Sequence, residues 1–237
     1  MTFDEVMKHL ASLGRADVVT SMAKFGIATP KSFGIKTPDL KQFARQVKKQ
    51  ADDRHMLAIE LWETGNYDAR AVAFMIDDPN KVTRQQMDAW AADFDNWGTV
   101  DGTCCYLFCR TPFAYDKAFE WADTNPEFLK RAGFSLMAYL AIHDKKAEDD
   151  KLATFLDIIE NHSDDDRNFV RKAVNWALRQ IGKRNSNLNK LAVETAARIK
   201  LRDTKSARWI ASDALRELKS ESVMNRFRAK ESANRTG

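Results

Sequence analysis

Trp176 lies among cationic side chains in a segment with helical periodicity. Apolar residues return every three or four positions between Arg167 and Arg184, which predicts an amphipathic helix. At about 100° per residue, Trp176 falls roughly 140° from the middle of the apolar stripe. It shares that side with Lys172, Arg179 and Lys183. An indole on a cationic solvent face indicates a ligand; the alternatives are coverage by lysine and arginine stems or contact with a second helix.

A carboxylate close to an aromatic ring is the second chemical feature. In a helix that begins near Asn96, Asp101 falls on the same side as the rings of Trp97 and Phe108. Burial of an unpaired carboxylate is costly, so Asp101 is paired, caps a helix, or faces a pocket that a polar ligand enters. Ordinary core packing is the alternative for Trp97.

Arg131 is the third feature, because its helix is apolar nearly all round. The stretch 128–142 carries only Lys130 and Arg131 as charges, and Arg131 is in line with the small residues Ser135 and Ala138. These leave a groove in which a guanidinium can meet a phosphate or a carboxylate such as Asp101. The spacing leaves both partners open.

Charge is distributed unevenly along the chain, although 38 lysines and arginines nearly balance 34 acids overall. Residues 167–208 hold twelve basic side chains and two acidic ones, whereas residues 144–166 hold nine acids and three lysines. The basic block predicts a phosphate-binding surface, and the tryptophan within it favours nucleic acid. The alternative is a set of solvated helix faces that the acidic segment balances in space.

The elements that must position these residues are helices, because no stretch alternates with a period of two. The segments 54–78, 84–108, 113–142 and 150–182 resemble successive helix pairs of similar size. We therefore predict an all-α solenoid of antiparallel helix pairs, curved, with a basic concave face. Residues 1–221 are expected to form one domain, and residues 222–237 a disordered tail.

Composition excludes several classes of protein. No apolar run reaches the ~18 residues of a membrane span, and the N-terminus lacks a signal pattern, so we expect a cytoplasmic, nucleoid-associated protein without membrane contact. The clustered Cys104, Cys105 and Cys109 indicate a reducing compartment rather than a disulfide framework. The four histidines are scattered, so we expect no metal and no cofactor.

The residues singled out above coincide with a known pattern. The chain resembles the AlkD-like DNA glycosylases of the DNA alkylation repair family, which are built of HEAT-like repeats. The resemblance covers most of the chain and is carried by Gly34–Pro38 (GIKTP), Asn96–Asp101 (NWGTVD), Phe128–Ala132 (FLKRA) and Phe169–Arg179 (FVRKAVNWALR). By position, the family's active-site aromatic, aspartate, arginine and late tryptophan correspond to Trp97, Asp101, Arg131 and Trp176.

The resemblance implies excision of cationic alkylated purines from double-stranded DNA. Asp101 would stabilise the developing sugar cation and hold the attacking water, with Trp97 and Trp176 packed against the sugar. Arg131 would bind a flanking phosphate. The further backbone contacts would come from Arg171, Lys172, Arg179 and Lys183.

Two features depart from the family pattern: Gly98 follows Trp97, and Phe25 occupies a position where a tyrosine is plausible. Both are expected to change the range of lesions without abolishing the chemistry. The family is known to act without full extrusion of the base.

Two other classes of function remain open. The chain is alternatively a noncatalytic HEAT-repeat protein that binds DNA or RNA, or a scaffold whose basic face receives an acidic protein. A monomer is expected.

Overall fold

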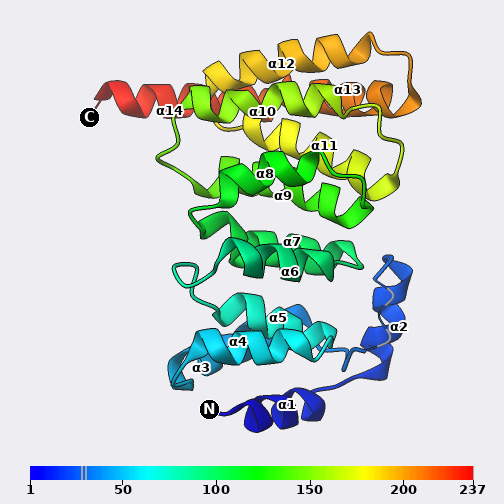
Figure 1. Ribbon diagram of the computed structural model, residues 1–237. Helices are drawn as coiled ribbons and strands as arrows, with labels where there is room; N and C mark the ends of the chain where they lie inside the picture. Colours follow the sequence, from blue (N-terminus) through cyan, green and yellow to red (C-terminus); the bar gives the residue numbers. More distant parts are fainter. Residues whose placement is uncertain (28, 30, 237) are drawn as a thin grey trace. The chain divides into compact units, whose positions relative to one another are not determined.

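The predicted helical periodicity is confirmed throughout the residues that the structure describes. The computed structural model describes residues 1–27, 29 and 31–236, and every regular element within them is a helix (Figure 1). The chain divides into two units, residues 1–114 and 115–237, where the sequence predicted one domain over residues 1–221. No helix in the described ranges is long and apolar enough to span a membrane.

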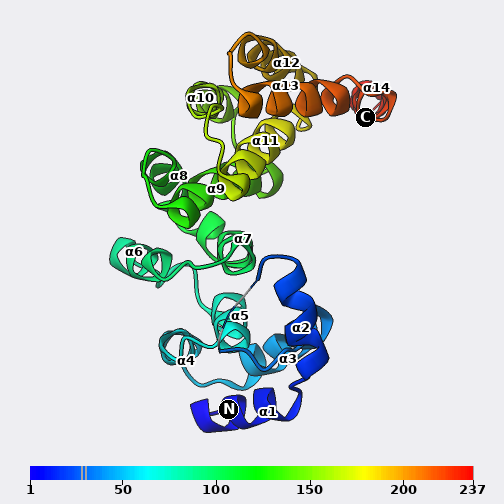
Figure 2. The same ribbon diagram turned by 90° about the vertical axis from the view of Figure 1, so that its right-hand side faces the viewer.

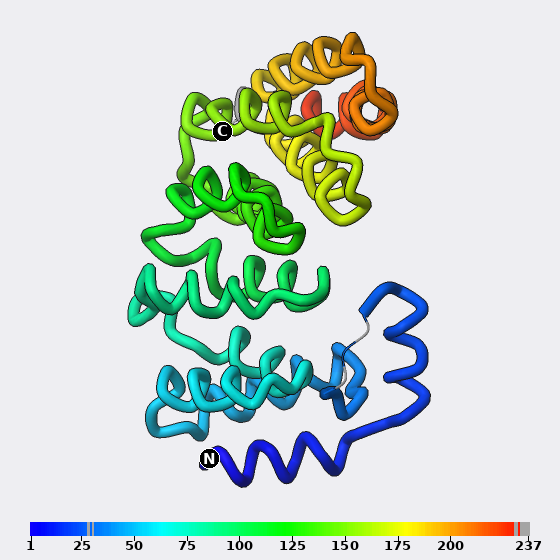
Figure 3. Tube along the Cα trace, turned by 45° about the vertical axis from the view of Figure 1, so that its right-hand side comes forward, coloured from blue at the N-terminus to red at the C-terminus, as the bar shows by residue number. Residues whose placement is uncertain are grey.

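Unit 1 contains the first seven α-helices and one short 3₁₀ helix. They are α1 Phe3–Ser12, α2 Ala16–Lys24, α3 Thr37–Gln50, α4 Arg54–Glu63, α5 Tyr67–Ile76, α6 Arg84–Ala92, α7 Trp97–Tyr106 and η1 Phe108–Arg110. Helices α4 and α6 lie on one side of this unit and α5 and α7 on the other (Figure 2). Helix α2 runs steeply across the direction of α1 and buries none of its residues (Figure 3).

A buried carboxylate fastens the loop before α3 to the start of α5. Asp68 has no exposed surface, and its two oxygens accept hydrogen bonds from the Ser32 hydroxyl and from the backbone N–H groups of residues 33–35. Gly34 has a φ of +78°, and a Cβ there would lie 2.3 Å from the Arg15 carbonyl oxygen. The loop therefore depends on one carboxylate and on one glycine.

Unit 2 continues the pattern of helix pairs. Its helices are α8 Ala114–Ala122, α9 Glu127–His143, α10 Asp149–Asn161, α11 Asn168–Gly182, α12 Ser186–Lys200, α13 Lys205–Leu218 and α14 Glu221–Thr236. Helix α10 contacts α12 in one layer, and α11 contacts both α9 and α13 in the other. Together with α4–α5 and α6–α7, the pairs α8–α9 and α10–α11 confirm the four segments expected from the sequence.

A constant register joins successive pairs in unit 2. Hydrogen bonds between neighbouring pairs recur at a separation of 38 residues. The bonded residues are 131 and 169, 149 and 187, 160 and 198, 164 and 202, 175 and 213, and 179 and 217. The repeat thus appears in the hydrogen bonds between successive helix pairs, although the sequence shows no strict repeat motif.

The C-terminal segment differs from its expected disorder. Helix α14 extends over Glu221–Thr236, and Val223 and Phe227, one turn apart, are only 6% and 5% exposed. These two apolar side chains attach a helix whose other residues are mostly polar. Gly237 lies outside the described residues.

Candidate functional site

Helix α7 begins where the sequence placed it. The Asn96 side chain accepts a hydrogen bond from the Thr99 N–H at 2.9 Å and caps the helix. The next residue, Trp97, is half-buried, and its indole Nε1 donates to the Phe25 carbonyl at 2.8 Å. Trp97 thus connects the start of α7 to the end of α2.

Asp101 lies outside the buried face of α7. That face consists of Thr99, Val100, Thr103 and Cys104, whereas Asp101 is partly exposed. The expected alignment with Phe108 is wrong, because α7 ends at Tyr106 and Phe108 belongs to η1. Partial exposure means that Asp101 is not enclosed in the core.

Two glycines one turn apart allow α5 to approach α7 closely. A Cβ on Gly98 would lie 2.7 Å from the Tyr67 hydroxyl, and one on Gly102 would lie 2.4 Å from the Phe74 ring. Glycine at position 98, noted above as a departure from the family, thus has a local structural reason. The same close approach brings the Tyr67 phenol to the side of α7 that carries Asp101.

Tyr67 is a residue of this region that the sequence did not single out. Burial, together with the negative charges of Asp68 and Asp101, raises the pKa of Tyr67 to about 12. At neutral pH the phenol is therefore a neutral hydrogen-bonding group close to Asp101. Its position two residues after Gly65 gives no signal of this role.

An apolar pocket of about 490 Å³ lies beside these residues. Trp97, Tyr67 and Phe74 contribute to its wall, as do both glycines of α7. A neighbouring hollow of about 380 Å³ is bordered by Phe25 and again by Trp97. Phe25 is 69% exposed. Unit 1 therefore presents aromatic surface next to a carboxylate.

Arg131, in α9 of unit 2, is buried with 7% of its surface exposed. Its Nη1 donates to the Phe169 carbonyl in the first turn of α11 at 2.7 Å. The guanidinium thus joins two helices through a backbone carbonyl. The sequence had suggested a phosphate or Asp101 as its partner. One of its five N–H donors is used in this bond.

Trp176 is half-buried on α11, and the apolar stripe from which it points away is confirmed. Val170, Ala173, Val174, Ala177, Leu178 and Ile181 have no exposed surface. The ring of Trp176 meets Tyr139 of α9 edge to face, with centroids 4.8 Å apart. With the Gln180 amide turned so that its oxygen faces the donors, that oxygen accepts from Trp176 Nε1 at 2.9 Å. The contact with a second helix, one of the alternatives for Trp176, is therefore present.

Helix α11 also forms a ladder with α13. The Arg171 guanidinium lies 4.8 Å from the centre of the Trp209 ring, and Asn175 donates to Asp213 at 2.7 Å. Arg179 binds Glu217, the third rung. The Nε atoms of Arg171 and Arg179 are buried without a hydrogen-bond partner.

Glu217 also holds Lys183, with Nζ 2.6 Å from Oε1. Burial alone would raise the pKa of Glu217, but hydrogen bonds from Lys183 and Arg179 outweigh burial and lower it. Two of the five cations expected to contact DNA, Arg179 and Lys183, are therefore paired within the protein. Lys172 is exposed.

Much of the basic block is balanced in the same way. Arg198 pairs with Glu160 at 2.8 Å, Arg202 pairs with Asp164, and Arg167 pairs with Asp165 at 2.5 Å. The acidic partners all lie in the segment 144–166. For these residues the alternative of charges balanced in space is confirmed.

The four residues matched to the family's active site are divided between the units, with Trp97 and Asp101 in unit 1 and Arg131 and Trp176 in unit 2. The family model for DNA alkylation repair enzymes matches residues 6–218. The chain belongs to the DNA alkylation repair enzyme family. This family member is similar to two curated proteins from Listeria that carry only the description of uncharacterized proteins.

The first, Lin0241 of Listeria innocua, is 25% identical over 138 residues, 57% of this chain and 61% of the relative. The second, Lmo0209 of Listeria monocytogenes, is 23% identical over 198 residues, 83% of this chain and 85% of the relative. The chain thus spans less than two thirds of the first relative.

A solved structure shares the fold of this DNA alkylation repair family member. It is described as representing "a new family of proteins related to the HEAT-like repeat DNA glycosylases with affinity for branched DNA structures". The TM-score is 0.75 at 24% identity, over 90% of this chain and 94% of the other. The α-solenoid of HEAT-like helix pairs expected from the sequence is therefore confirmed.

Proposed function

We propose that this protein is a monofunctional DNA glycosylase that hydrolyses the N-glycosidic bond of cationic alkylated purines in duplex DNA. The substrates are 7-alkylguanine and 3-alkyladenine. The observation that carries the proposal is the placement of Asp101, partly exposed on α7 one turn after Trp97, which lines a pocket with aromatic walls, in a chain of the DNA alkylation repair family.

The chemistry requires few groups. Alkylation at a ring nitrogen gives the base a formal positive charge, so the base leaves neutral and needs no general acid. One carboxylate is then sufficient. This agrees with a site in which Asp101 has a neutral phenol, Tyr67, as its titratable neighbour.

Positive charge accumulates on the deoxyribose as the bond breaks. Asp101 stabilises the oxocarbenium-like sugar electrostatically and orients the water that attacks the opposite face. Trp97 offers an aromatic face to the developing cation, an interaction of roughly 0.5 to 2 kcal/mol. In unit 2, Trp176 offers its ring to the DNA. The exposed Lys172 contributes a phosphate contact, which fixes position without reading sequence, whereas Arg131 is buried and holds the Phe169 carbonyl.

The test is release of free base from duplex DNA that carries 7-methylguanine, under single-turnover conditions. We expect Asp101→Asn to lower the rate by ~10³-fold, as for loss of one preorganised electrostatic group. The dissociation constant for the same DNA should change little, because asparagine has the same shape.

One control variant accompanies the measurement. Asp95→Asn removes an exposed carboxylate just before α7 and should leave the rate unchanged. Equal rates for wild type and Asp101→Asn would contradict the proposed mechanism.

Binding of branched DNA without catalysis is a second candidate, favoured by the affinity described for the solved relative. Trp209 is 39% exposed, with Arg171 over its ring, and such a ring stacks on unpaired bases. Tighter binding of a four-way junction than of linear duplex, reduced by Trp209→Ala, would support it if no alkylated base is released. Equal affinity for both DNAs would contradict it.

A further inference from the structure

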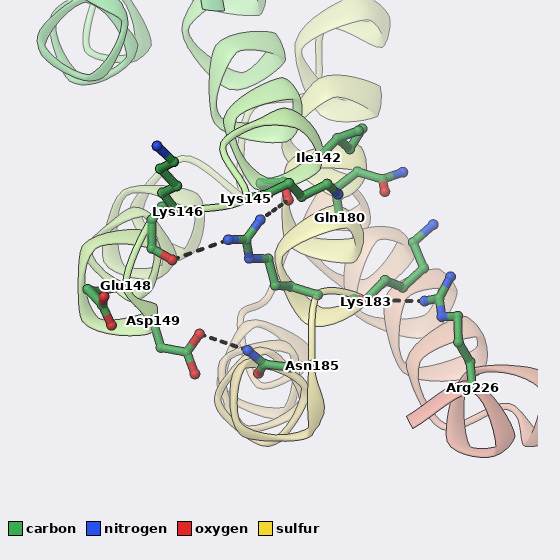
Figure 4. A pocket seen from close by; sticks show the side chains of 12 residues that line it. Ile142, Lys145, Lys146, Glu148, Asp149, Gln180, Lys183, Asn185 and Arg226 are labelled. Carbon is green, nitrogen blue, oxygen red and sulfur yellow. Dashed lines mark hydrogen bonds between the residues drawn. The ribbon is translucent and has the colours of Figure 1, made fainter. Parts of the chain in front are cut away.

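A polar pocket of about 550 Å³ lies where α9 and α11 end (Figure 4). Five cationic side chains line it: Lys145, Lys146, Lys183, Arg184 and Arg226. They come from the loop after α9, the end of α11 and helix α14. Figure 4 shows Lys146 and Arg226 at opposite sides of the pocket.

The arginines of the pocket are held in place. Arg184 donates to the Ala141 carbonyl at 3.1 Å and to the Ala147 carbonyl at 3.2 Å. Arg226 donates from Nη2 to the Lys183 carbonyl at 3.0 Å. Because a guanidinium has five N–H donors, Arg226 keeps further donors for a ligand while its position is fixed.

The net charge of the pocket is positive even when its acidic groups are included. Two acids, Glu148 and Asp149, line it, and Asp149 accepts from the amides of Asn185 and Asn187, both at 2.8 Å. The ends of α9 and α11 add roughly half a negative charge each. Even with Lys183 assigned to Glu217, four cations face these groups. The pocket therefore suits an anion.

Gln180 connects this pocket to Trp176. It lines the pocket, and its oxygen, in the orientation given above, accepts from Lys183 Nζ at 3.2 Å as well as from the indole. Gln180 follows Trp176 by one helical turn, about 5.4 Å along the axis. In a DNA strand, phosphates succeed one another every ~3.4 Å along the helix axis, so one turn of α11 spans one to two nucleotides.

We propose that this pocket binds a backbone phosphate of the DNA strand whose nucleotide lies against Trp176. The proposal rests on the proposed function for the presence of DNA at Trp176. It adds a specific anchor, formed by Lys145, Lys146 and Arg226, one to two nucleotides along the strand. None of these three residues was among the DNA contacts expected from the sequence.

The test measures the dissociation constant for undamaged duplex DNA at several salt concentrations. In Lys145→Gln combined with Lys146→Gln, we expect affinity at low salt to fall ~10-fold and the slope of log K against log salt to fall by about 1. Arg226→Gln, from a different helix, should act in the same direction.

The matched control is Lys190→Gln combined with Lys200→Gln, two exposed lysines of α12 that give the same change in charge. An equal loss of affinity in the two double variants would overturn the proposal, since general charge would then explain the loss. Unchanged affinity in the pocket variant would overturn it as well.

Orthophosphate at constant ionic strength distinguishes a strand phosphate from a free one. Saturable orthophosphate binding that the pocket variant loses, together with unchanged DNA affinity, would overturn the assignment to DNA. If wild type releases no base, the proposed function fails. The comparison of DNA affinity in the two double variants would still test whether the pocket binds a DNA phosphate.

Discussion

The surroundings of Asp101 in unit 1 and the seam between α11 and α13 in unit 2 hold polar groups in different ways. Around α7, close backbone approach at Gly98 and Gly102 positions the residues, and the Asp68 carboxylate binds backbone N–H groups. Along α11, side chains of opposite charge pair between helices. The arrangement around α7 depends on shape, and the seam between α11 and α13 depends on charge. Only the seam pairs side chains that were expected to bind DNA.

The largest effect on stability is expected from removal of the buried Asp68 carboxylate in unit 1. Asp68→Ala leaves the N–H groups of residues 33–35 without their acceptor, so the free energy of unfolding should fall by about 3 kcal/mol. Chemical denaturation measures it. Asp53→Ala, which removes an exposed cap of α4, should cost about 1 kcal/mol. Equal costs would show that the loop is not fastened by Asp68.

Overpacking between α5 and α7 should have the next largest effect. Gly102→Ala places a methyl group against Phe74, and the strain of ~1 to 3 kcal/mol should exceed the gain in helix propensity. Thermal denaturation should show a lower Tm. Adding Phe74→Leu makes room for the methyl group and should recover part of the loss. A Tm for Gly102→Ala at or above that of wild type would mean that the two helices separate without cost.

In the charge-dependent seam, removal of the acid should release a cation. Glu217→Gln frees Lys183 and leaves Arg179 with Asp213, 3.6 Å away, so we expect tighter DNA binding at low salt and a slope of log K against log salt that is steeper by about 1. The loss of stability should stay below about 1 kcal/mol because the pairs are partly exposed. Glu194→Gln, an exposed acid on α12, controls for net charge. An identical gain in both variants would place Lys183 outside the DNA contact.

The smallest effect concerns pH. The pKa of Glu217 is lower in the folded protein than its ordinary value of 4.5, so its contribution to stability is present above that value and is lost as pH falls through the folded pKa. Wild type should therefore lose more stability than Glu217→Gln between neutral pH and pH values below 4.5. Denaturation curves at both pH values measure this difference, and equal losses would contradict it.

The spacing of residues along the sequence was sufficient to predict the helices. It did not predict which residues pair with the polar side chains of those helices. The stripe of α11 and the start of α7 follow from spacing and from one capping residue, and both are confirmed. The pairing of Arg179 with Glu217 depends on the register between helices 38 residues apart, which no local pattern carries. The helix at the C-terminus buries Val223 and Phe227, a pair of apolar residues too short to produce a visible period.

The ladder between α11 and α13 also has a mechanical consequence. Its three rungs join residues 171 and 209, 175 and 213, and 179 and 217, at one-turn intervals along two parallel helices. A slip of one helix along the other by a single residue, about 1.5 Å, would misalign all three rungs together. The layers therefore resist sliding more strongly than any one rung does, and a pull along the helix axes would meet resistance from all of them at once.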